Sequence, residues 1–431
     1  MERIAIPEEV KTVILTIKNA GFEAYLVGGC VRDLILGIQP NDFDICTSAL
    51  PEEIIKVFDG YETILTGIRY GTVTVIVDSK QYEITTYRKE CNYADGRHPS
   101  SVEFSADLYS DLSRRDFTIN AIAYDGFSDT EDLDGFIDPF HGIDDILDRR
   151  IRCVGNPDER FQEDALRIIR CLRFAIRFRF GIEENTFCAM ERNAELIKNL
   201  SAERISSELS KTIKQVDDMS GRRLGGKRNL SFLLSLIDTY VGISVSRDIE
   251  FISLCIDYSD NDLPTCLAAI FDDSNIENIL RTLKFSNNTI KRACAIREFG
   301  YNIVKEVLLR SVMKRKEDIR HCARKFLNEL SYDLLKKSIV FAEAMLMPKA
   351  TELVMLELNR LSSAINACFE NGDVYELKRL AINGDDLSEV GCKGKNIGLV
   401  LVSLLNKVMR DELTNDKDVL IDAYRNMGVI I

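Results

Sequence analysis

The sequence predicts an α+β protein in which a mixed β-sheet with helices is followed by an almost wholly helical region. Four short segments near the N-terminus are rich in β-forming residues: 24–27, 42–46, 72–77 and 82–87. Helical patterns separate them at 31–36 and 51–58. After about residue 155, apolar residues recur with a helical period, and few glycines or prolines interrupt them.

Composition narrows the class of protein. The chain has 431 residues, of which 45% are hydrophobic and 29% charged. It is therefore expected to form several folded domains and is not disordered, collagen-like or a small disulfide-stabilised protein. Its net charge of −13 argues against a general nucleic-acid coat protein but leaves a local basic surface open. The three histidines lie far apart, which excludes a histidine-rich metal site.

The twelve cysteines show no C-x-x-C spacing, and several lie in apolar helical stretches. The N-terminal MERIAIPEEV is charged and lacks the apolar run of a signal peptide. We therefore expect reduced thiols and a cytoplasmic location. No apolar run approaches the roughly 20 residues that span a bilayer, so no membrane anchor is expected.

Two turn signals divide the chain more finely. The turn-like DSKQ at 78–81 lies between two predicted strands, so a hairpin is expected there. Glycine and charge cluster at 217–231, which predicts a break between a helical segment at 155–215 and a second one at roughly 230–330. A helical tail is expected from about residue 331.

The first candidate site follows the predicted strand that ends at Val27. Gly28 and Gly29 come directly before a predicted helix. Glycines let a ligand approach the backbone closely, and the free N–H groups at a helix N-terminus bind phosphate. Taken alone, the pair favours a tight turn.

Asp42 and Asp44 strengthen the case for a phosphate-binding site. On a strand, residues two apart point to the same face, and adjacent carboxylates repel unless a cation lies between them. Mg²⁺ is bound by few carboxylates together with phosphate oxygens, so the combination with the glycines suits nucleotidyl transfer. Glu83, on a strand expected to neighbour that of the aspartates, is the candidate third carboxylate. The alternatives are an exposed acidic loop for the aspartates and a solvent-facing strand position for Glu83.

The segment LSRRDFTINA places Arg115 and Asp116 before a predicted helix with buried apolar residues. Asp116 would cap that helix in the simplest interpretation. An aspartate that accepts hydrogen bonds beside an arginine that donates them would also suit a ribose hydroxyl. This motif alone favours the cap.

Nine arginines, four acidic residues and no lysine lie between 149 and 180. This surplus of positive charge predicts phosphate contacts, and a solvated helix face is the alternative. Asp164 and Arg167 are three residues apart, so they are expected to project from one helical face and to act together. An ordinary surface ion pair would have the same spacing.

Taken in order, these segments resemble the conserved motifs of a known family. GGCVRD with DFD, then RRDFTINA, DPFHG at 138–142 and EDALRIIR at 163–170 resemble motifs A to D of class II tRNA nucleotidyltransferases. That family comprises the CCA-adding enzymes and bacterial poly(A) polymerases. LSAERISSEL at 200–209 resembles the fifth motif, which braces the fourth, and 380–408 is similar to the tRNA-binding C-terminal segment of bacterial members.

The resemblance implies a nucleotidyltransferase head at 1–150, a helical neck for base recognition at 151–215, a helical body at 216–330 and a tRNA-binding tail at 331–431. It implies Asp42 and Asp44 as Mg²⁺ ligands, with Glu83 as the third catalytic carboxylate. The residues that it implies for nucleotide binding are Gly28, Gly29, Arg32, Arg115, Asp116, Asn120, Asp164, Arg167 and Arg170. The expected partners are tRNA, CTP and ATP, and no protein partner is inferred.

The chemistry of the bases agrees with this assignment. Cytosine and adenine each carry an amino donor beside a ring nitrogen acceptor, whereas guanine and uracil carry a carbonyl in place of that amino group. A carboxylate such as Asp164 beside a guanidinium such as Arg167 therefore complements C and A and mismatches G and U.

The segment Arg88 to Glu103 is polar and contains glycine and proline, so a mobile loop is expected. It resembles the flexible loop of enzymes that add the whole CCA sequence, which is therefore the favoured activity. The alternatives are partial CC or A addition, poly(A) synthesis and, in a different class, a non-catalytic RNA-binding protein. Lys393 and Lys395 in the tail are expected to contact tRNA phosphates.

Overall fold

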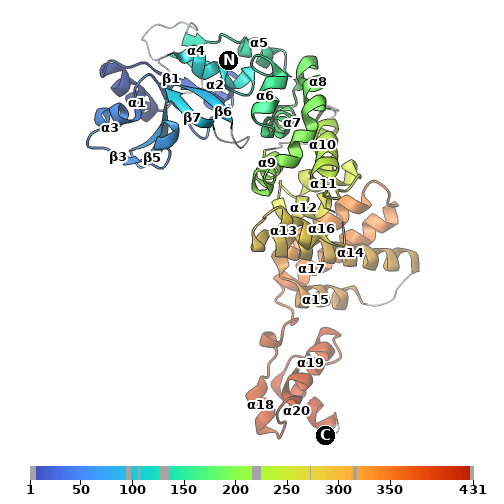
Figure 1. The fold of residues 1–431 in the computed structure, drawn as a ribbon. Helices are drawn as coiled ribbons and strands as arrows, with labels where there is room; N and C mark the ends of the chain where they lie inside the picture. Colours follow the sequence, from blue (N-terminus) through green and yellow to red (C-terminus); the bar gives the residue numbers. More distant parts are fainter. Residues whose placement is uncertain are drawn as a thin grey trace. The chain divides into compact units, whose positions relative to one another are not determined.

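The computed structural model describes residues 6–93, 99–104, 107–125, 135–215, 225–271, 273–313 and 318–427. The chain folds into two compact units (Figure 1). Unit 1 comprises Met1–Thr212 with Gly221–Ile243, and unit 2 comprises Ile213–Ser220 with Ser244–Ile431. The expected head and the expected neck as far as Thr212 fall in unit 1, together with Gly221–Ile243 of the expected body. The rest of the expected body and the expected tail fall in unit 2. The finer division into four domains stays a prediction.

Unit 1 contains the predicted mixed sheet, with seven strands in the order β3-β4-β5-β2-β1-β8-β9. Their bounds are β1 Ala24–Val27, β2 Ile45–Thr47, β3 Glu62–Ile64, β4 Thr72–Val77, β5 Lys80–Thr86, β8 Ala123–Tyr124 and β9 Phe136–Ile137. Strands β2 and β5 pair in parallel, and the other neighbours are antiparallel. The parallel pair is what brings the end of the predicted aspartate motif beside β5.

The predicted hairpin is confirmed. Strands β4 and β5 are joined by Asp78 and Ser79, which both have positive φ, 49° and 64°. Two such residues form the tight turn whose twist matches that of the flanking strands. Alternate residues of β4, Val73, Val75 and Val77, are buried. Helices α1 (Glu8–Asn19) and α3 (Pro51–Val57) pack against each other and on this sheet, and α2 (Gly29–Ile35) follows β1.

Two predicted elements near the site differ from the structure. Strand β2 begins at Ile45, so Asp42 and Asp44 lie in the loop before it. Aspartate is disfavoured in strands, which is consistent with the late start. The helix expected after Asp116 is a single 3₁₀ turn, η2 (Thr118–Asn120), because the chain must extend again to pair β8 with β1. Tertiary pairing here overrides the local helical pattern.

The segment 88–103, which was expected to be a mobile loop, instead contains two strands. Strands β6 (Arg88–Tyr93) and β7 (Pro99–Phe104) form a separate antiparallel pair, followed by α4 (Leu108–Ser113). Residues 94–98, which hold most of the D-G-R-H-P run, lie outside the described residues. β6 and β7 pair through their backbones, and the polar composition of the segment alone does not indicate such pairing.

The rest of unit 1 is mainly helical, as predicted, except that Arg150–Ile151 and Gly181–Ile182 form a short parallel two-stranded sheet. Its elements are α5 Gly142–Leu147, β10 Arg150–Ile151, α6 Pro157–Glu163, α7 Leu166–Phe178, β11 Gly181–Ile182, α8 Glu184–Asn193, η4 Ala194–Asn199, α9 Ala202–Lys214, α10 Gly225–Leu236 and η5 Ile237–Val241. Of the break expected at 217–231, residues 217–224 lie outside the described residues, whereas from Gly225 onward the chain is helical.

Unit 2 is all-helical in its described residues. Its elements are α11 Ile249–Tyr258, α12 Leu263–Ile270, α13 Ile276–Thr282, α14 Asn287–Met313, α15 Ile319–Glu329, α16 Tyr332–Leu346, α17 Glu352–Glu370, η6 Leu377–Arg379, α18 Gly384–Glu389, α19 Asn396–Met409 and α20 Lys417–Asn426. One apolar core extends from Ile303 to Leu420, across the expected body–tail boundary.

Two expectations about the chain as a whole can be compared with the described residues. The structure describes the side chains of eleven of the twelve cysteines; these eleven are free thiols, and nine of them are buried. Among the described helices, none combines the length and the apolar character needed to cross a bilayer.

Gly300 in α14 provides a test of the packing in unit 2. A Cβ atom there would lie 2.3 Å from Cδ1 of the fully buried Phe341 on α16. We expect Gly300→Ala to lower the free energy of unfolding by about 1–3 kcal/mol through overpacking. The control is Gly398→Ala in α19, where no atom lies within 4 Å. Alanine should stabilise that helix by up to about 1 kcal/mol. Urea denaturation measures the free energy of unfolding of both variants. Equal changes in Gly300→Ala and Gly398→Ala would contradict the close packing at Gly300.

Candidate nucleotide-binding site

The strand–glycine–helix junction forms as predicted. Strand β1 ends at Val27, Gly28 has a φ of 79°, and α2 starts at Gly29. A Cβ atom on Gly28 would lie 2.7 Å from Nη1 of Arg115. The glycine is therefore needed both for its backbone conformation and for the close approach of this arginine.

The three predicted carboxylates come from neighbouring backbone segments. The parallel register pairs Ile45 with Ile84, which places Asp44, one residue earlier, beside Glu83. The backbone oxygen of Asp44 accepts a hydrogen bond from Val27, which anchors the loop to β1. Within the described part of the chain, no hydrogen bond or ion pair engages the carboxylates of Asp42, Asp44 or Glu83. They therefore remain available to an external cation.

The pKa values of Asp44 and Glu83 show that this arrangement of carboxylates is electrostatically unfavourable. Asp44 and Glu83 reach solvent, yet partial loss of hydration raises the pKa of both carboxyls. The charge of Asp42 raises the pKa of Asp44 further, whereas Arg115 lowers it. Asp44 and then Asp42 add to the increase at Glu83. Mutual influence of this kind indicates that the three carboxylates lie close together.

The donor set fits a hard divalent cation. The described residues include no group of three His, Cys, Asp or Glu side chains arranged to hold a metal by themselves. Mg²⁺ requires less, because it is bound by one or two carboxylates and completes its coordination with water and substrate phosphates. Asp42 and Asp44 supply suitable oxygens, with Glu83 adjacent.

Arg115 and Asp116 are oriented by different partners. Nη2 of Arg115 lies 3.1 Å from Oδ2 of Asp111, and its Nη1 lies 3.5 Å from the backbone oxygen of Asn120. Asp116 accepts hydrogen bonds from Nε and Nη2 of Arg170 at 2.9 and 2.6 Å and from Nδ2 of Asn120 at 3.0 Å. Burial opposes ionisation of Asp116, but Arg170 and Asn120 outweigh it and hold its pKa well below the ordinary value.

The capping alternative for Asp116 is therefore not what the structure contains. Its carboxylate bonds the amide of Phe117, but only a single 3₁₀ turn follows, and its main partner is Arg170 on α7. Asp116 links the head to the neck within unit 1.

Arg32 extends this network. It is 3% exposed, and its guanidinium donates to Asp33 and to Oδ1 of Asn120. It also lies over the ring of Phe178 in α7, 4.6 Å from the centroid. A continuous polar chain thus connects α2 through η2 to α7. Arg32 and Asn120 were predicted as nucleotide contacts, and the structure shows them holding these elements together.

Asp164 and Arg167 do not share one helical face, which corrects the sequence-based expectation. Asp164 has extended backbone between α6 and α7, and its carboxylate bonds the amide of Leu166. Arg204 on α9 binds both oxygens of Asp164, at 2.7 and 3.0 Å. The fifth motif therefore does contact the fourth.

Arg167 has partners of its own. It is 7% exposed and donates to Oε2 of Glu163 at 2.6 Å and to the backbone oxygen of Arg114 at 3.0 Å. The helix break at Asp164 directs the two side chains separately, so tertiary contacts fix where each one lies.

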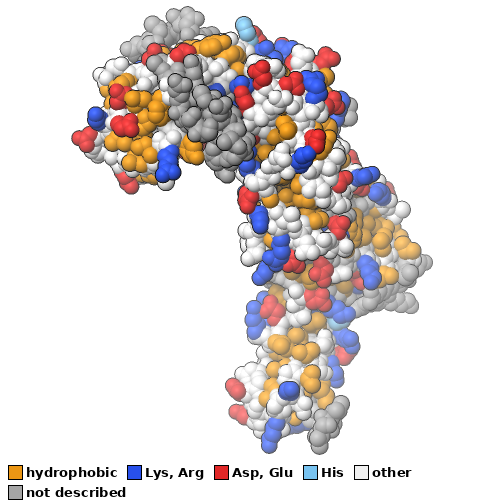
Figure 2. Space-filling view, in the orientation of Figure 1, with side chains coloured by type: hydrophobic (Ala, Val, Ile, Leu, Met, Phe, Trp, Pro, Cys, Tyr) orange, Lys and Arg blue, Asp and Glu red, His pale blue; other side chains and the backbone are white. Residues whose placement is uncertain are grey.

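The arginine-rich segment is not a free basic surface. At least seven of its nine arginines form ion pairs, several with acids from outside the segment: Arg150, Arg152, Arg160, Arg167, Arg170, Arg173 and Arg177. Glu208 on α9, for example, lies 2.6 Å from the buried Arg173. On the face drawn in Figure 2, acidic and basic side chains are interspersed. The expected phosphate contacts of the neck arginines would require these pairs to open.

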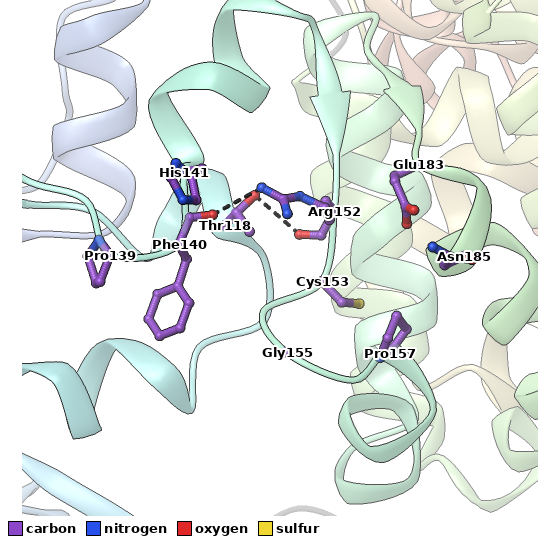
Figure 3. A pocket seen from close by; sticks show the side chains of 10 residues that line it. All are labelled: Thr118, Pro139, Phe140, His141, Arg152, Cys153, Gly155, Pro157, Glu183 and Asn185. Carbon is purple, nitrogen blue, oxygen red and sulfur yellow. Dashed lines mark hydrogen bonds between the residues drawn. The ribbon is translucent and has the colours of Figure 1, made fainter.

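The DPFHG segment has a structural explanation. Asp138 accepts hydrogen bonds from the amides of Gly142 and Ile143 at the start of α5. A Cβ atom on Gly142 would lie 2.1 Å from the backbone oxygen of Thr118. A hollow of about 370 Å³ beside this segment is lined by ten residues, including Thr118 and Arg152 (Figure 3). None of the predicted site residues lines it.

The interpretation of single motifs missed residues that the structure brings to the site. Asp111 contacts Arg115, and Glu208 contacts Arg173. For Asp111 the available signal was its spacing, three and four residues before two arginines near a helix end. For Glu208, no local signal existed, because its partner lies 35 residues earlier.

Comparison with known proteins agrees with this architecture. Residues 24–152 match the "Poly A polymerase head domain", 179–216 the "Probable RNA and SrmB- binding site of polymerase A", and 263–424 the "tRNA nucleotidyltransferase domain 2 putative". The chain is 35% identical over 435 residues to the CCA-adding enzyme of Ligilactobacillus salivarius, with 98% of each chain covered. It is 34% identical over 438 residues to that of Lactococcus lactis subsp. cremoris, again covering 98% of each.

Solved structures give the same result. The CCA-adding enzyme of Bacillus stearothermophilus in complex with CTP matches with a TM-score of 0.73 at 27% identity over 97% of each chain. The Thermotoga maritima CCA-adding enzyme complexed with tRNA shares the fold, with a TM-score of 0.67 at 20% identity over 99% of this chain and 97% of that one. Fold and motifs together define a class II tRNA nucleotidyltransferase. The chain belongs to the family of CCA-adding enzymes.

The raised pKa values predict how the candidate site affects stability. The folded state binds protons at Asp44 and Glu83 more tightly than the unfolded state does, so stability should fall as the pH rises from about 4 through the raised values. At pH values above both raised pKa values, this contribution to stability is completely lost. Asp44→Asn or Glu83→Gln should therefore raise the free energy of unfolding at pH 7 and flatten its dependence between pH 4 and 7.

Urea unfolding without divalent metal measures this effect. Asp59→Asn, an exposed carboxylate after α3, is the control and should leave both quantities unchanged. A loss of stability in Asp44→Asn or Glu83→Gln would show that these carboxylates support the fold.

Proposed function

We propose that this chain adds C, C and A to the 3′ end of tRNA from CTP and ATP without a nucleic-acid template. The observation that supports this most is the combination of two groups in unit 1. Asp42, Asp44 and Glu83 lie together without protein counter-ions among the described residues, whereas Asp164 and Arg167 are held by ionic partners on the neck. The first group suits nucleotidyl transfer, and the second suits selection of C and A.

In the proposed reaction, the 3′ hydroxyl of tRNA attacks the α-phosphorus of the nucleotide and pyrophosphate leaves. Asp42 and Asp44 would bind Mg²⁺, with Glu83 beside them. Mg²⁺, when bound, neutralises phosphate charge and orients the reacting groups. The backbone at Gly28 and Gly29 would approach the phosphates, and Arg115 with Asp116 would hold the ribose.

Base selection is proposed for Asp164 and Arg167. Asp164 would accept from the amino group of C or A, and Arg167 would donate to the ring nitrogen. In the structure Arg204 occupies both carboxylate oxygens of Asp164. Oδ1 of Asp164 also accepts from the amide of Leu166, so the remaining acceptor site lies on Oδ2. Arg204 can therefore hold Asp164 in place while Oδ2 reads a base.

The tail is proposed to bind tRNA through the exposed Lys393 and Lys395, beside the N-terminus of α19. The structure changes how this can be tested. Leu404 and Leu420 belong to the core that begins at Ile303, so removal of 381–431 would expose that core. Charge reversal at the two lysines is the cleaner perturbation.

The free thiols among the described residues support the expected cytoplasmic location.

The central experiment supplies tRNA lacking its 3′ CCA with CTP and ATP, separately and together, and sequences the products. We expect CC with CTP alone and CCA with both. Asp42→Ala and Asp44→Ala should each lower incorporation of both nucleotides by at least about a hundredfold while tRNA binding persists, because transfer depends on charge neutralisation and positioning. CC alone, A alone or long A tracts would identify the partial enzymes or poly(A) synthesis. No Mg²⁺-dependent incorporation at all would leave an RNA-binding protein.

The base-selection proposal predicts a loss of discrimination. Asp164→Ala should reduce C and A incorporation and relax exclusion of U and G, by about one to two orders of magnitude in selectivity, because a polar partner is lost in a closed site. Asp158→Ala is the matched control, since Asp158 on α6 also binds an arginine through both oxygens. Single-turnover incorporation of all four nucleotides by the wild type and both variants measures this discrimination. If Asp164→Ala retains full discrimination, another group reads the base.

A further inference from the structure

Asp111 on α4 is a buried carboxylate that lies between two arginines. It is 1% exposed. Its Oδ1 accepts from Nη2 and Nε of Arg114, at 2.6 and 3.1 Å, and its Oδ2 accepts from Nη2 of Arg115 at 3.1 Å. Both oxygens are thus engaged by the two arginines of the R-R-D motif.

Charge keeps this carboxylate ionised. Burial opposes ionisation, but the charges of Arg114 and Arg115 and their hydrogen bonds outweigh it and hold the pKa of Asp111 below its ordinary value. One negative charge therefore serves two cations. Without it, two guanidinium groups would repel each other in a partly buried place.

The contact fixes the end of the Arg115 side chain. The bond from Nη2 to Asp111 leaves Nη1 next to Gly28, where a Cβ atom would come within 2.7 Å. Asp111 thus orients a cation that lies beside the glycine turn after β1.

The backbone at 113–115, which carries Arg114 and Arg115, contacts helices α6 and α7. The backbone oxygen of Arg114 accepts from Nη2 of Arg167 at 3.0 Å, and that of Ser113 accepts from Nη1 of Arg160 at 3.3 Å. Because Asp111 holds the side chain of Arg114, it also restrains the backbone to which Arg167 is bonded. One carboxylate is therefore connected to both halves of the proposed nucleotide site.

We propose that Asp111 is a positioning residue that sets Arg115 against the nucleotide phosphates and ribose and, through the turn at 113–115, holds Arg167 at the base. This inference rests on the proposed function, because it assigns nucleotide contacts to Arg115 and Arg167. It adds a residue outside the predicted site. Asp111 itself need not touch the nucleotide.

A second buried aspartate provides a matched control. Asp145 on α5 is 0% exposed and lies 2.7 Å from Nε of Arg152 and 3.3 Å from Nη2 of Arg150. It resembles Asp111 in burial and in having two arginine partners. Neither of those arginines is a predicted nucleotide ligand.

The test compares full-length Asp111→Asn and Asp145→Asn. Thermal unfolding measures the structural cost, and equilibrium titration with CTP and with ATP measures nucleotide affinity without requiring tRNA. We expect both variants to lose thermal stability. Only Asp111→Asn should weaken binding of both nucleotides, by about tenfold to a hundredfold, as expected for a displaced charged hydrogen bond. Asp145→Asn should bind both within about twofold of the wild type.

Asp111→Glu covers the case in which Asp111→Asn does not fold. It keeps the charge but moves the carboxylate by one methylene group, so it should fold and bind both nucleotides more weakly than the wild type. Equal affinities in Asp111→Asn and Asp145→Asn, or wild-type affinity in Asp111→Glu, would overturn the inference.

The outcomes separate this inference from the proposed function. If the wild type binds CTP and ATP but does not extend tRNA, the proposed function fails while the affinities still decide the role of Asp111. If the wild type extends tRNA and Asp111→Asn behaves as Asp145→Asn does, only the inference fails. A wild type that binds neither nucleotide contradicts both.

Discussion

The ion pair between Arg170 on α7 and Asp116 before η2 is the interaction on which the rest of unit 1 depends. Both Arg170 nitrogens that bond Asp116 lie within 2.9 Å of one oxygen, and Asn120 occupies the other. Loss of Arg170 would leave the buried carboxylate of Asp116 without its counter-ion, which typically costs about 3–5 kcal/mol. The network that continues through Arg32 to α2 makes the sheet and the neck one folded unit.

Against this background, the carboxylates of Asp42, Asp44 and Glu83 stand out. The chain supplies arginine partners to Asp111, Asp116 and Asp164, yet the described residues supply none in ion-pair contact to these three. Groups that repel one another, with raised pKa values at Asp44 and Glu83, reduce stability rather than add to it. An arrangement that the fold does not need is best explained by a cation and phosphates that arrive with the substrate.

The neck shows how misleading a local sum of charges can be. Its arginines outnumber its acids in sequence, but Glu208, Asp116, Asp33 and Asp145 reach them from other segments. Most of these arginines therefore have acidic partners within unit 1, and their contact with tRNA phosphates stays a prediction.

The sequence by itself determined the fold class, the β4–β5 hairpin, the glycine junction after β1 and the family, because each depends on local patterns and on ordered motifs. It did not determine the start of β2, the single turn after Asp116 or the break at Asp164. At the turn after Asp116 and at the break at Asp164, pairing or ion pairs with distant residues outweigh small local preferences. Tertiary structure alone decided which acid meets which arginine: Asp164 with Arg204 and Arg173 with Glu208 are each joined across more than 30 residues. Spacing along one helix does not contain that information.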